Sequence, residues 1–429
     1  MLGVFTLHDL AALLFCLTVG LLVLTFKRIR GLGPAWIVAG LIFFRVGYMA
    51  LRFISGKPLF DQDVALYYKY GSSILRGEPV AAEYPELALL IFSLAALPSR
   101  SLMEFRIVFP LMTLPFGCLA TYMIYRLGLI LSDKETASAF AMIYALSPFT
   151  AIFWMFKFDE VAVTFALLGI YFMASGRRLL LGSATALGFL VKWFPILVLP
   201  ASIIHYFKSN RKGVLEVIGG FAASAAPILL LFHYFVKGSW LHAYIFHGSR
   251  PINGESLYYL IEYALTGKLI RPSSGANPVY ITNDVVLIVA SAAVILWLIY
   301  LAATVKGDNL IFLSALTIMF AVMFNKVYST QFIIWLIPAI LICAAQLPSR
   351  IRLAYGGLTA TALQILNYLK TPMLSDTPWW IIPSLFFWTI NIASVAVLAW
   401  RACRMTATIP ELSRRPGWLG CGFPFRDGG

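Results

Sequence analysis

Charge is scarce in this sequence. Of the 429 residues, 12% are charged and 60% are hydrophobic, and the mean hydropathy is +0.84. So little charge excludes an ordinary soluble domain, whose surface needs polar side chains. Lipid offers no partner for backbone amides, so a chain inside it must form helices or a closed barrel. The apolar runs are long and do not alternate as barrel strands would, so the composition predicts an all-α polytopic membrane protein.

Cysteine is also rare, with five in the chain. Cys16, Cys118 and Cys343 lie in apolar runs, and Cys403 and Cys421 lie near the basic C-terminal end. No Cys-x-x-Cys pair occurs, and no cysteine falls in an expected outer loop. We therefore expect neither a disulfide nor a cysteine-based metal site.

Several signature motifs are missing. The chain contains no HExxH, GxSxG, P-loop or Rossmann fingerprint, so hydrolase and nucleotide-hydrolysing functions lack support. It also shows no convincing internal repeat, which argues against a transporter built from two related halves.

Apolar runs predict about thirteen crossings, counting as two the half-crossings into which Lys192-Trp193-Phe194-Pro195 divides residues 179–207. Residues 87–98 are apolar but too short to span about 30 Å at 1.5 Å per residue, so we expect an interfacial or re-entrant helix there. The expected spans are 8–26, 35–54, 103–131, 137–156, 159–176, 179–207, 214–236, 283–304, 308–324, 330–346, 352–369 and 380–402.

Lysine and arginine set the expected orientation, because they favour cytoplasmic loops. With the N-terminus outside, the inner loops are strongly basic, whereas positive and negative charges nearly balance in the outer loops. Membrane orientation therefore accounts for most of the net charge of +14, and no nucleic-acid partner is needed to explain it. We expect one transmembrane domain over 1–404, in the plasma (inner) membrane and with its functional side facing outward. It would have an additional N-terminal helix in 1–34, outer loops in 55–102 and 237–282, and a basic cytosolic tail in 405–429.

The candidate functional residues fall in the expected outer loops. Asp61 and Asp63 precede Tyr67, and Glu83 precedes Tyr84, so carboxylates stand beside amphipathic rings, which suits a sugar or a polar head group. The other candidates are Asp159, Lys192, His247, Arg250, Lys326 and Gln331. Plainer interpretations stay open: a merely solvated acidic loop, a local ion pair of Lys157 with Asp159, a Lys192 side chain that reaches toward the interface, and an ordinary loop histidine at His247.

Together these residue types make chemical sense. A carboxylate can take the proton of an acceptor hydroxyl, while Lys and Arg hold a phosphate leaving group. Nucleotide-sugars are made in the cytosol, so an outward-facing sugar transferase needs a donor carried on a lipid. Its phosphate would lie at head-group level, where Lys192, Arg250 and Lys326 are expected. Asp61-Gln62-Asp63 could hold a divalent cation, but Lys and Arg suffice for a lipid monophosphate, so we expect no metal and no other cofactor.

Short motifs over about 58–340 carry a family resemblance. The early ones are Asp63-Val64-Ala65-Leu66-Tyr67-Tyr68-Lys69-Tyr70-Gly71, Gly77-Glu78-Pro79 and Glu83-Tyr84-Pro85-Glu86. The later ones are Phe158-Asp159-Glu160, Lys192-Trp193-Phe194-Pro195 and Ser329-Thr330-Gln331-Phe332. Together they resemble glycosyltransferase family 87, membrane enzymes of the GT-C class that use polyprenyl-phosphate-mannose. The family commonly shows Glu-Tyr-Pro-Pro where this chain has Glu86 after Pro85, and Gln-Tyr where it has Gln331-Phe332.

The resemblance implies a GT-C-like helix bundle in the lipid bilayer. It also implies an inverting transfer of one sugar, mannose, from a polyprenyl phosphate to a glycolipid or glycan acceptor. Asp63 would take the acceptor proton, or Asp61 would if the loop bends differently. A transporter or flippase of lipid-linked sugars is the alternative, although the single-sided charges and the lack of repeats argue against it. A purely structural membrane scaffold comes third.

Overall fold

The computed structural model describes residues 7–25, 27, 29–54, 62–236, 242–253, 255–268, 278–370 and 380–405. All regular structure in these ranges is helical, which confirms the all-α prediction. The α-helices are α1 Leu7–Thr25, α2 Pro34–Ile54, α3 Gln62–Leu75, α4 Glu86–Ala96, α5 Leu102–Leu131, α6 Lys134–Ala145, α7 Pro148–Phe156, α8 Asp159–Ala174, α9 Arg178–Val191, α10 Leu199–Ser209, α11 Arg211–Phe235, α12 His242–Ser249, α13 Leu257–Thr266, α14 Asn283–Thr304, α15 Leu310–Met323, α16 Ile333–Ala345, α17 Ser349–Leu369 and α18 Ile381–Arg404. Short 3-10 turns are η1 Ile29–Gly31, η2 Phe194–Val198, η4 Gly307–Asn309 and η5 Thr330–Phe332.

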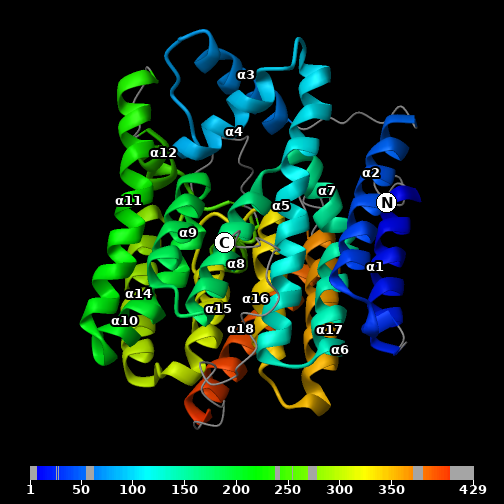
Figure 1. Cartoon of the computed structure of the whole chain (residues 1–429), viewed down its shortest axis with the longest axis vertical. Helices are drawn as coiled ribbons and strands as arrows, with labels where there is room; N and C mark the ends of the chain where they lie inside the picture. The colour runs from blue at the N-terminus through cyan, green and yellow to red at the C-terminus, as the bar shows by residue number, and fades with distance from the viewer. Residues whose placement is uncertain are drawn as a thin grey trace, which may run out of the picture.

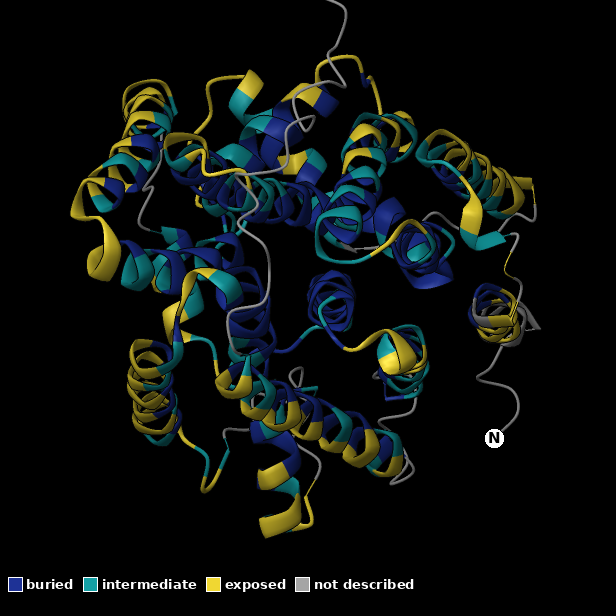
Figure 2. Ribbon diagram, turned by 60° about the horizontal axis from the view of Figure 1, so that its bottom comes forward, coloured by how far each residue is buried: buried dark blue, intermediate teal, exposed yellow. Residues whose placement is uncertain are grey.

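Most of the helices run side by side as a bundle, and α3 and α4 lie across its upper end (Figure 1). The bundle is built around α16, in which every residue is buried. A helix that is apolar all round belongs in an interior, and α15 and α17 pack against this one. Buried residues accordingly gather at the centre of the bundle and exposed ones at its rim (Figure 2). The exposed residues on α14 include Leu287, Ile288 and Leu296, as expected of a face in lipid.

In the described part of the chain, five helices are long and apolar enough to cross a membrane, namely α2, α5, α11, α14 and α18. The pair α6 and α7 makes a sixth if it is counted as one broken span. The prediction of a helical membrane protein is therefore supported, whereas the expected number of about thirteen crossings is not confirmed. The intervening apolar helices, such as α8, α9 and α15, are shorter than a full span.

The expected span over 137–156 is not one straight helix. The chain breaks at Ser147, and α6 and α7 are bent by 48° relative to each other. Ser147 is extended (φ −66°, ψ 123°), because the residue before a proline disfavours the helical conformation and Pro148 follows it. The Ser147 hydroxyl accepts a hydrogen bond from the Thr150 amide, so it caps α7.

Of two other local predictions, the break after α9 is confirmed, and the interfacial or re-entrant helix near 87–98 is borne out only as a short helix. The expected break at Lys192-Trp193-Phe194-Pro195 separates α9 from η2, with Lys192 in an extended conformation (φ −162°, ψ 140°). The short apolar run near 87–98 forms α4, which has 11 residues and lies across the end of the bundle rather than through it.

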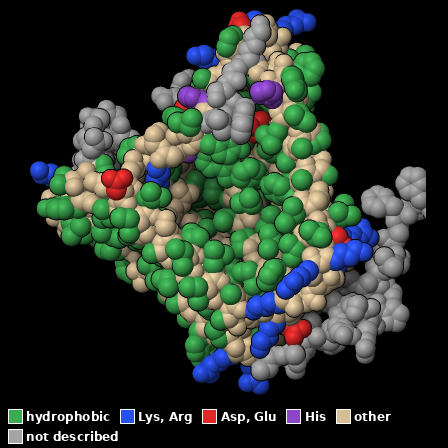
Figure 3. Space-filling model, turned by 90° about the vertical axis from the view of Figure 1, so that its left-hand side faces the viewer, with side chains coloured by type: hydrophobic (Ala, Val, Ile, Leu, Met, Phe, Trp, Pro, Cys, Tyr) green, Lys and Arg blue, Asp and Glu red, His purple; other side chains and the backbone are tan. Residues whose placement is uncertain are grey.

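Charge is distributed unevenly between the two ends of the bundle. On the face in Figure 3, Lys and Arg side chains are more numerous toward the lower end than toward the upper end. In Figure 1 the connections from α1 to α2, from α8 to α9 and from α10 to α11 lie at this lower end. Basic residues on these connections include Lys27, Arg177, Arg178, Arg211 and Lys212. Helices α3 and α4, which carry Asp63 and Glu86, lie at the opposite end. The face in Figure 3 is mostly hydrophobic, and it is hollowed below the level of the histidine side chains.

Candidate active site

The predicted site residues meet where four helical segments start or stop near the upper end of the bundle. Asp63 lies in the first turn of α3, and Asp159 opens α8. Lys192 follows the last residue of α9, and the η5 turn precedes α16. Helix ends leave backbone groups unpaired and force the chain to change direction, so polar side chains collect there.

Asp63 forms an ion pair with Lys157, which lies 94 residues further along the chain. The Asp63 side chain is 37% exposed, whereas that of Lys157 is 12% exposed. The carboxylate therefore stands at the edge of the site, within reach of a molecule that arrives from outside. The lysine fixes its position from the inner side.

Asp159 lies deeper and is fully buried. Its Oδ1 accepts hydrogen bonds from Lys192 Nζ at 2.7 Å and from Trp335 Nε1 at 2.8 Å. Its Oδ2 is buried and has no hydrogen-bond partner among the described residues. Lys192 points at this carboxylate and lies 5.1 to 5.5 Å from the ring centroids of Phe158, Phe332 and Trp335. The alternative of a Lys192 side chain that reaches out to the interface does not fit this geometry.

An aromatic cluster forms the floor under Asp63. Tyr67 stacks on Phe92 with ring centroids 4.3 Å apart, and Tyr84 and Phe158 meet it edge-on at 5.4 and 5.5 Å. Tyr67 is 1% exposed, so its ring is covered by protein. Tyr84 is only partly buried and lies nearer the surface. The cluster holds α3 and α4 against the start of α8, which keeps Asp63 close to Asp159.

His247 of α12 connects the long outer loop to the site. Its Nε2 pairs with the carbonyl oxygen of Glu83 at 2.9 Å, and its ring meets Trp193 edge-on at 4.4 Å. Burial lowers the pKa of His247 to about 4, and the positive charges of Arg250, Lys192 and Lys326 add to this effect. These are the three cations that the sequence predicts for phosphate binding, so all three act on one neutral imidazole.

Arg250 and Lys326 flank the same histidine. Lys326 Nζ donates to the carbonyl oxygen of Gly248 at 2.6 Å, and the Arg250 guanidinium lies 5.4 Å from the ring centroid of Phe246. Burial raises the pKa of Glu83, while the Arg250 charge opposes that shift. The residues over 83–84 and 247–250, far apart in sequence, therefore share one electrostatic environment.

For two predicted site residues, Gln331 and Asp61, the described part of the structure gives no hydrogen bond or ion pair with the rest of the site. Gln331 is half-buried in η5, beside Thr330. Asp61 lies outside the described residues, so its suggested role as an alternative base stays a prediction.

Glu255 is a functional candidate that the sequence interpretation missed. It accepts a hydrogen bond from the Thr330 hydroxyl at 2.9 Å, and Lys157 acts on it electrostatically. Lys370 donates to its backbone carbonyl at 2.9 Å and lies 4.0 Å from the ring centroid of Tyr328. Its position as the first carboxylate of the long outer loop was the available signal.

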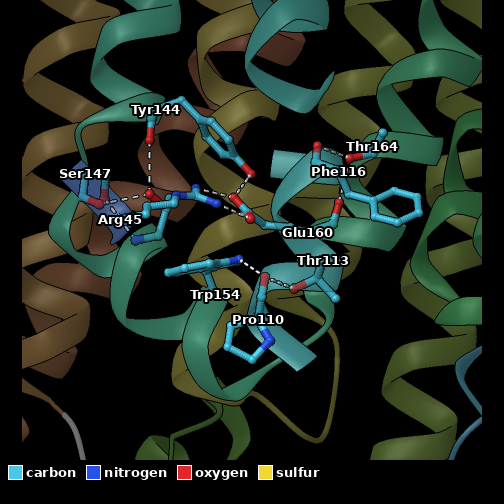
Figure 4. A network of polar contacts seen from close by, with 10 residues as sticks. Arg45, Pro110, Thr113, Phe116, Tyr144, Ser147, Trp154, Glu160 and Thr164 are labelled. Atoms are coloured by element: carbon cyan, nitrogen blue, oxygen red, sulfur yellow. Dashed lines mark hydrogen bonds and ion pairs between the residues drawn. The ribbon is translucent and has the colours of Figure 1, made fainter. Parts of the chain in front are cut away.

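A buried ion pair between α2 and the start of α8 lies next to the site (Figure 4). The Arg45 guanidinium of α2 makes two hydrogen bonds of 2.5 Å to the carboxylate of Glu160, the residue after Asp159. The Tyr144 hydroxyl donates to the same carboxylate at 3.0 Å, and Arg45 lies 5.8 Å from the ring centroid of Trp154. The start of α8 is thus held on one side by Arg45 and on the other by Lys192.

The described residues contain no group of three or more His, Cys, Asp or Glu side chains arranged to hold a metal ion. Comparison of the whole chain with protein-family models, with curated proteins and with solved structures found no match. The interpretation of the site therefore depends on its own geometry and on the sequence motifs.

Proposed function

We propose that the chain is a membrane glycosyltransferase that moves a sugar, mannose, from a polyprenyl-phosphate donor to a glycolipid or glycan acceptor. One observation carries the proposal: Lys192, Arg250 and Lys326 lie near enough to the buried His247 to lower its pKa. Lys326 donates to the carbonyl oxygen of Gly248, and Trp193, next to Lys192, contacts the His247 ring. Asp63 and Asp159, each paired with a lysine, lie beside the aromatic cluster. A cluster of cations suits a phosphate, and carboxylates beside aromatic rings suit a sugar.

In the proposed reaction the acceptor hydroxyl oxygen attacks the anomeric carbon of the donor sugar. The bond between that carbon and the phosphate oxygen breaks, and the polyprenyl phosphate leaves with the bonding electron pair. Asp63 takes the hydroxyl proton, which is reasonable for a carboxylate that is partly exposed at the edge of the site. The attack from the opposite face inverts the anomeric configuration.

The cations would serve the leaving group. Negative charge grows on the phosphate as the bond breaks, and charged donors fixed in a partly buried site stabilise it more than water would. Lys192 is held in place by Asp159 and by three aromatic rings, so it needs little reorganisation. Arg250 and Lys326 come from loops and would close over the phosphate from the outer side.

The orientation belongs to the same proposal. Positively charged residues favour the cytosol, so the basic lower end in Figure 3 would face it and the site would face outward, in the plasma (inner) membrane. A lipid-linked donor could reach the site from the bilayer, consistent with the hydrophobic, hollowed face seen there.

The test is a transfer assay. Purified protein in lipid is incubated with radiolabelled polyprenyl-phosphate-mannose and membrane glycolipids, and a labelled product with a new glycosidic bond is the expected result. A flippase would move labelled donor across vesicles without forming that bond. Donor translocation without any new product would contradict the proposal.

A further inference from the structure

Glu86 is a buried carboxylate that the described side chains and backbone leave unpaired. It is the first residue of α4 and is 3% exposed, yet neither of its side-chain oxygens has a hydrogen-bond partner among the described residues. A buried carboxylate without partners is costly, and such groups persist where a ligand or ordered water completes their hydrogen bonds. Glu86 takes no part in the proposed transfer step.

The neighbours of Glu86 form a small aromatic site. Leu87 packs against Ala186 and Leu190 of α9, which brings the start of α4 to the end of α9. Tyr244 of α12 is close enough to feel the Glu86 charge, and its ring stacks on Trp193 with centroids 5.5 Å apart and planes 19° from parallel. The indole nitrogen of Trp193 is also buried and without a partner among the described residues.

These open groups define the chemistry of a ligand. Two carboxylate oxygens require two donors, such as neighbouring hydroxyls, and the indole N–H requires an acceptor oxygen. Aromatic rings offer an apolar surface for the C–H face of a sugar. A quaternary ammonium group would satisfy the carboxylate and the rings, but it would leave the indole N–H unpaired. The hydroxyls, ring C–H groups and oxygens of a pyranose can satisfy the carboxylate, the aromatic rings and the indole N–H together.

We propose that Glu86, Trp193 and Tyr244 form a sugar subsite that binds a ring of the acceptor next to the proposed reaction centre. Trp193 adjoins Lys192 in the chain and contacts His247, so a ring held here lies beside the candidate donor-phosphate site. That the ring belongs to the acceptor rests on the proposed function. The binding of a sugar ring by these three residues does not.

Binding is tested without turnover. Methyl α-mannoside is titrated into purified wild type, Glu86→Gln and Trp193→Phe, with Glu78→Gln and Trp36→Phe as controls at exposed positions, and binding is followed by calorimetry. The wild type and both controls should bind. The two subsite variants should bind about tenfold to a hundredfold more weakly, the range for one lost hydrogen bond to a charged or buried group.

Thermal unfolding separates a binding role from a packing role. Glu86→Gln removes an unpaired buried charge, so this variant should melt at the same temperature as the wild type or higher while it binds the mannoside more weakly. Equal binding by wild type and both variants, or no binding by the wild type, would overturn the subsite. So would binding of choline in place of the mannoside.

Different results would refute the sugar subsite and the proposed transfer reaction. Mannoside binding that depends on Glu86 and Trp193, with no transfer from lipid-linked mannose, would refute the reaction and keep the subsite. Transfer with an acceptor KM unchanged in Glu86→Gln and Trp193→Phe would refute the subsite and keep the reaction.

Discussion

Asp63 is the residue on which the proposed chemistry depends most. We expect Asp63→Asn, which keeps the size of the side chain and removes the base, to lower turnover by about 10²–10⁴-fold. The amide oxygen can still accept from Lys157, so folding and donor binding should be retained. Transfer rates and donor affinity are measured beside Asp284→Asn, an exposed carboxylate loss at the start of α14. Near-normal turnover in Asp63→Asn would move the base elsewhere.

His247 gives the second prediction at this scale. Its pKa of about 4 in the folded protein lies below its usual 6.5, so both states are neutral above pH 6.5. As the pH falls from 6.5 toward 4, His247 becomes protonated in the unfolded chain but stays neutral in the folded protein. The free energy of unfolding therefore falls. His247→Gln should therefore lose less melting temperature between pH 7 and pH 5 than the wild type, whereas His233→Gln, at an exposed position, should behave as the wild type. The same pH dependence in His247→Gln and wild type would contradict the shift.

At the scale of elements, the close packing of α2, α5 and α8 requires a residue without a side chain at Gly117. A Cβ at Gly117 of α5 would lie 2.3 Å from Arg45 Nη1 and 2.7 Å from Glu160 Oε2. Both groups are held by their mutual hydrogen bonds, so neither can yield cheaply. Gly117→Ala should destabilise the protein by about 1–3 kcal/mol, as overpacked sites do.

Gly47→Ala on α2 is the matched control, because a Cβ there meets nothing within 4 Å. Alanine favours a helix over glycine by about 1 kcal/mol, so this variant should be at least as stable as the wild type. Thermal unfolding in detergent measures both. An unchanged melting temperature in Gly117→Ala would show that the Arg45–Glu160 pair can move aside.

The elements also show where prediction from sequence works. The run expected over 283–304 is α14, residue for residue, because an unbroken apolar stretch encodes its own helix. The break inside 137–156 was missed, although Ser147-Pro148 was its local signal. The pairs Arg45–Glu160 and Lys157–Asp63 span 115 and 94 residues, and no local pattern states which distant charge will be the partner. The sequence thus predicts the helices and many candidate side chains, while the pairings come from the fold.

At the scale of the whole molecule, the two ends of the bundle carry different kinds of side chain. The basic end collects short connections with Lys and Arg, and the other end holds the Asp63–Lys157 and Asp159–Lys192 pairs at helix ends. A lipid-linked donor and a cytosolic nucleotide-sugar would come from opposite sides of the membrane. The side that Asp63 faces therefore decides between these two kinds of donor.

This orientation is tested by cysteine labelling in intact cells. Cys403 and Cys421 are first replaced by serine, and single cysteines are placed at Ala81, exposed near the site, and at Asn210, exposed between α10 and α11. The positive-inside rule predicts that an impermeant thiol reagent labels Ala81→Cys from outside and labels Asn210→Cys only after the membrane is permeabilised. The reverse pattern would place Asp63 beside cytosolic nucleotide-sugars. It would refute the lipid-linked donor, since the reason for requiring one is that the site faces away from the cytosol.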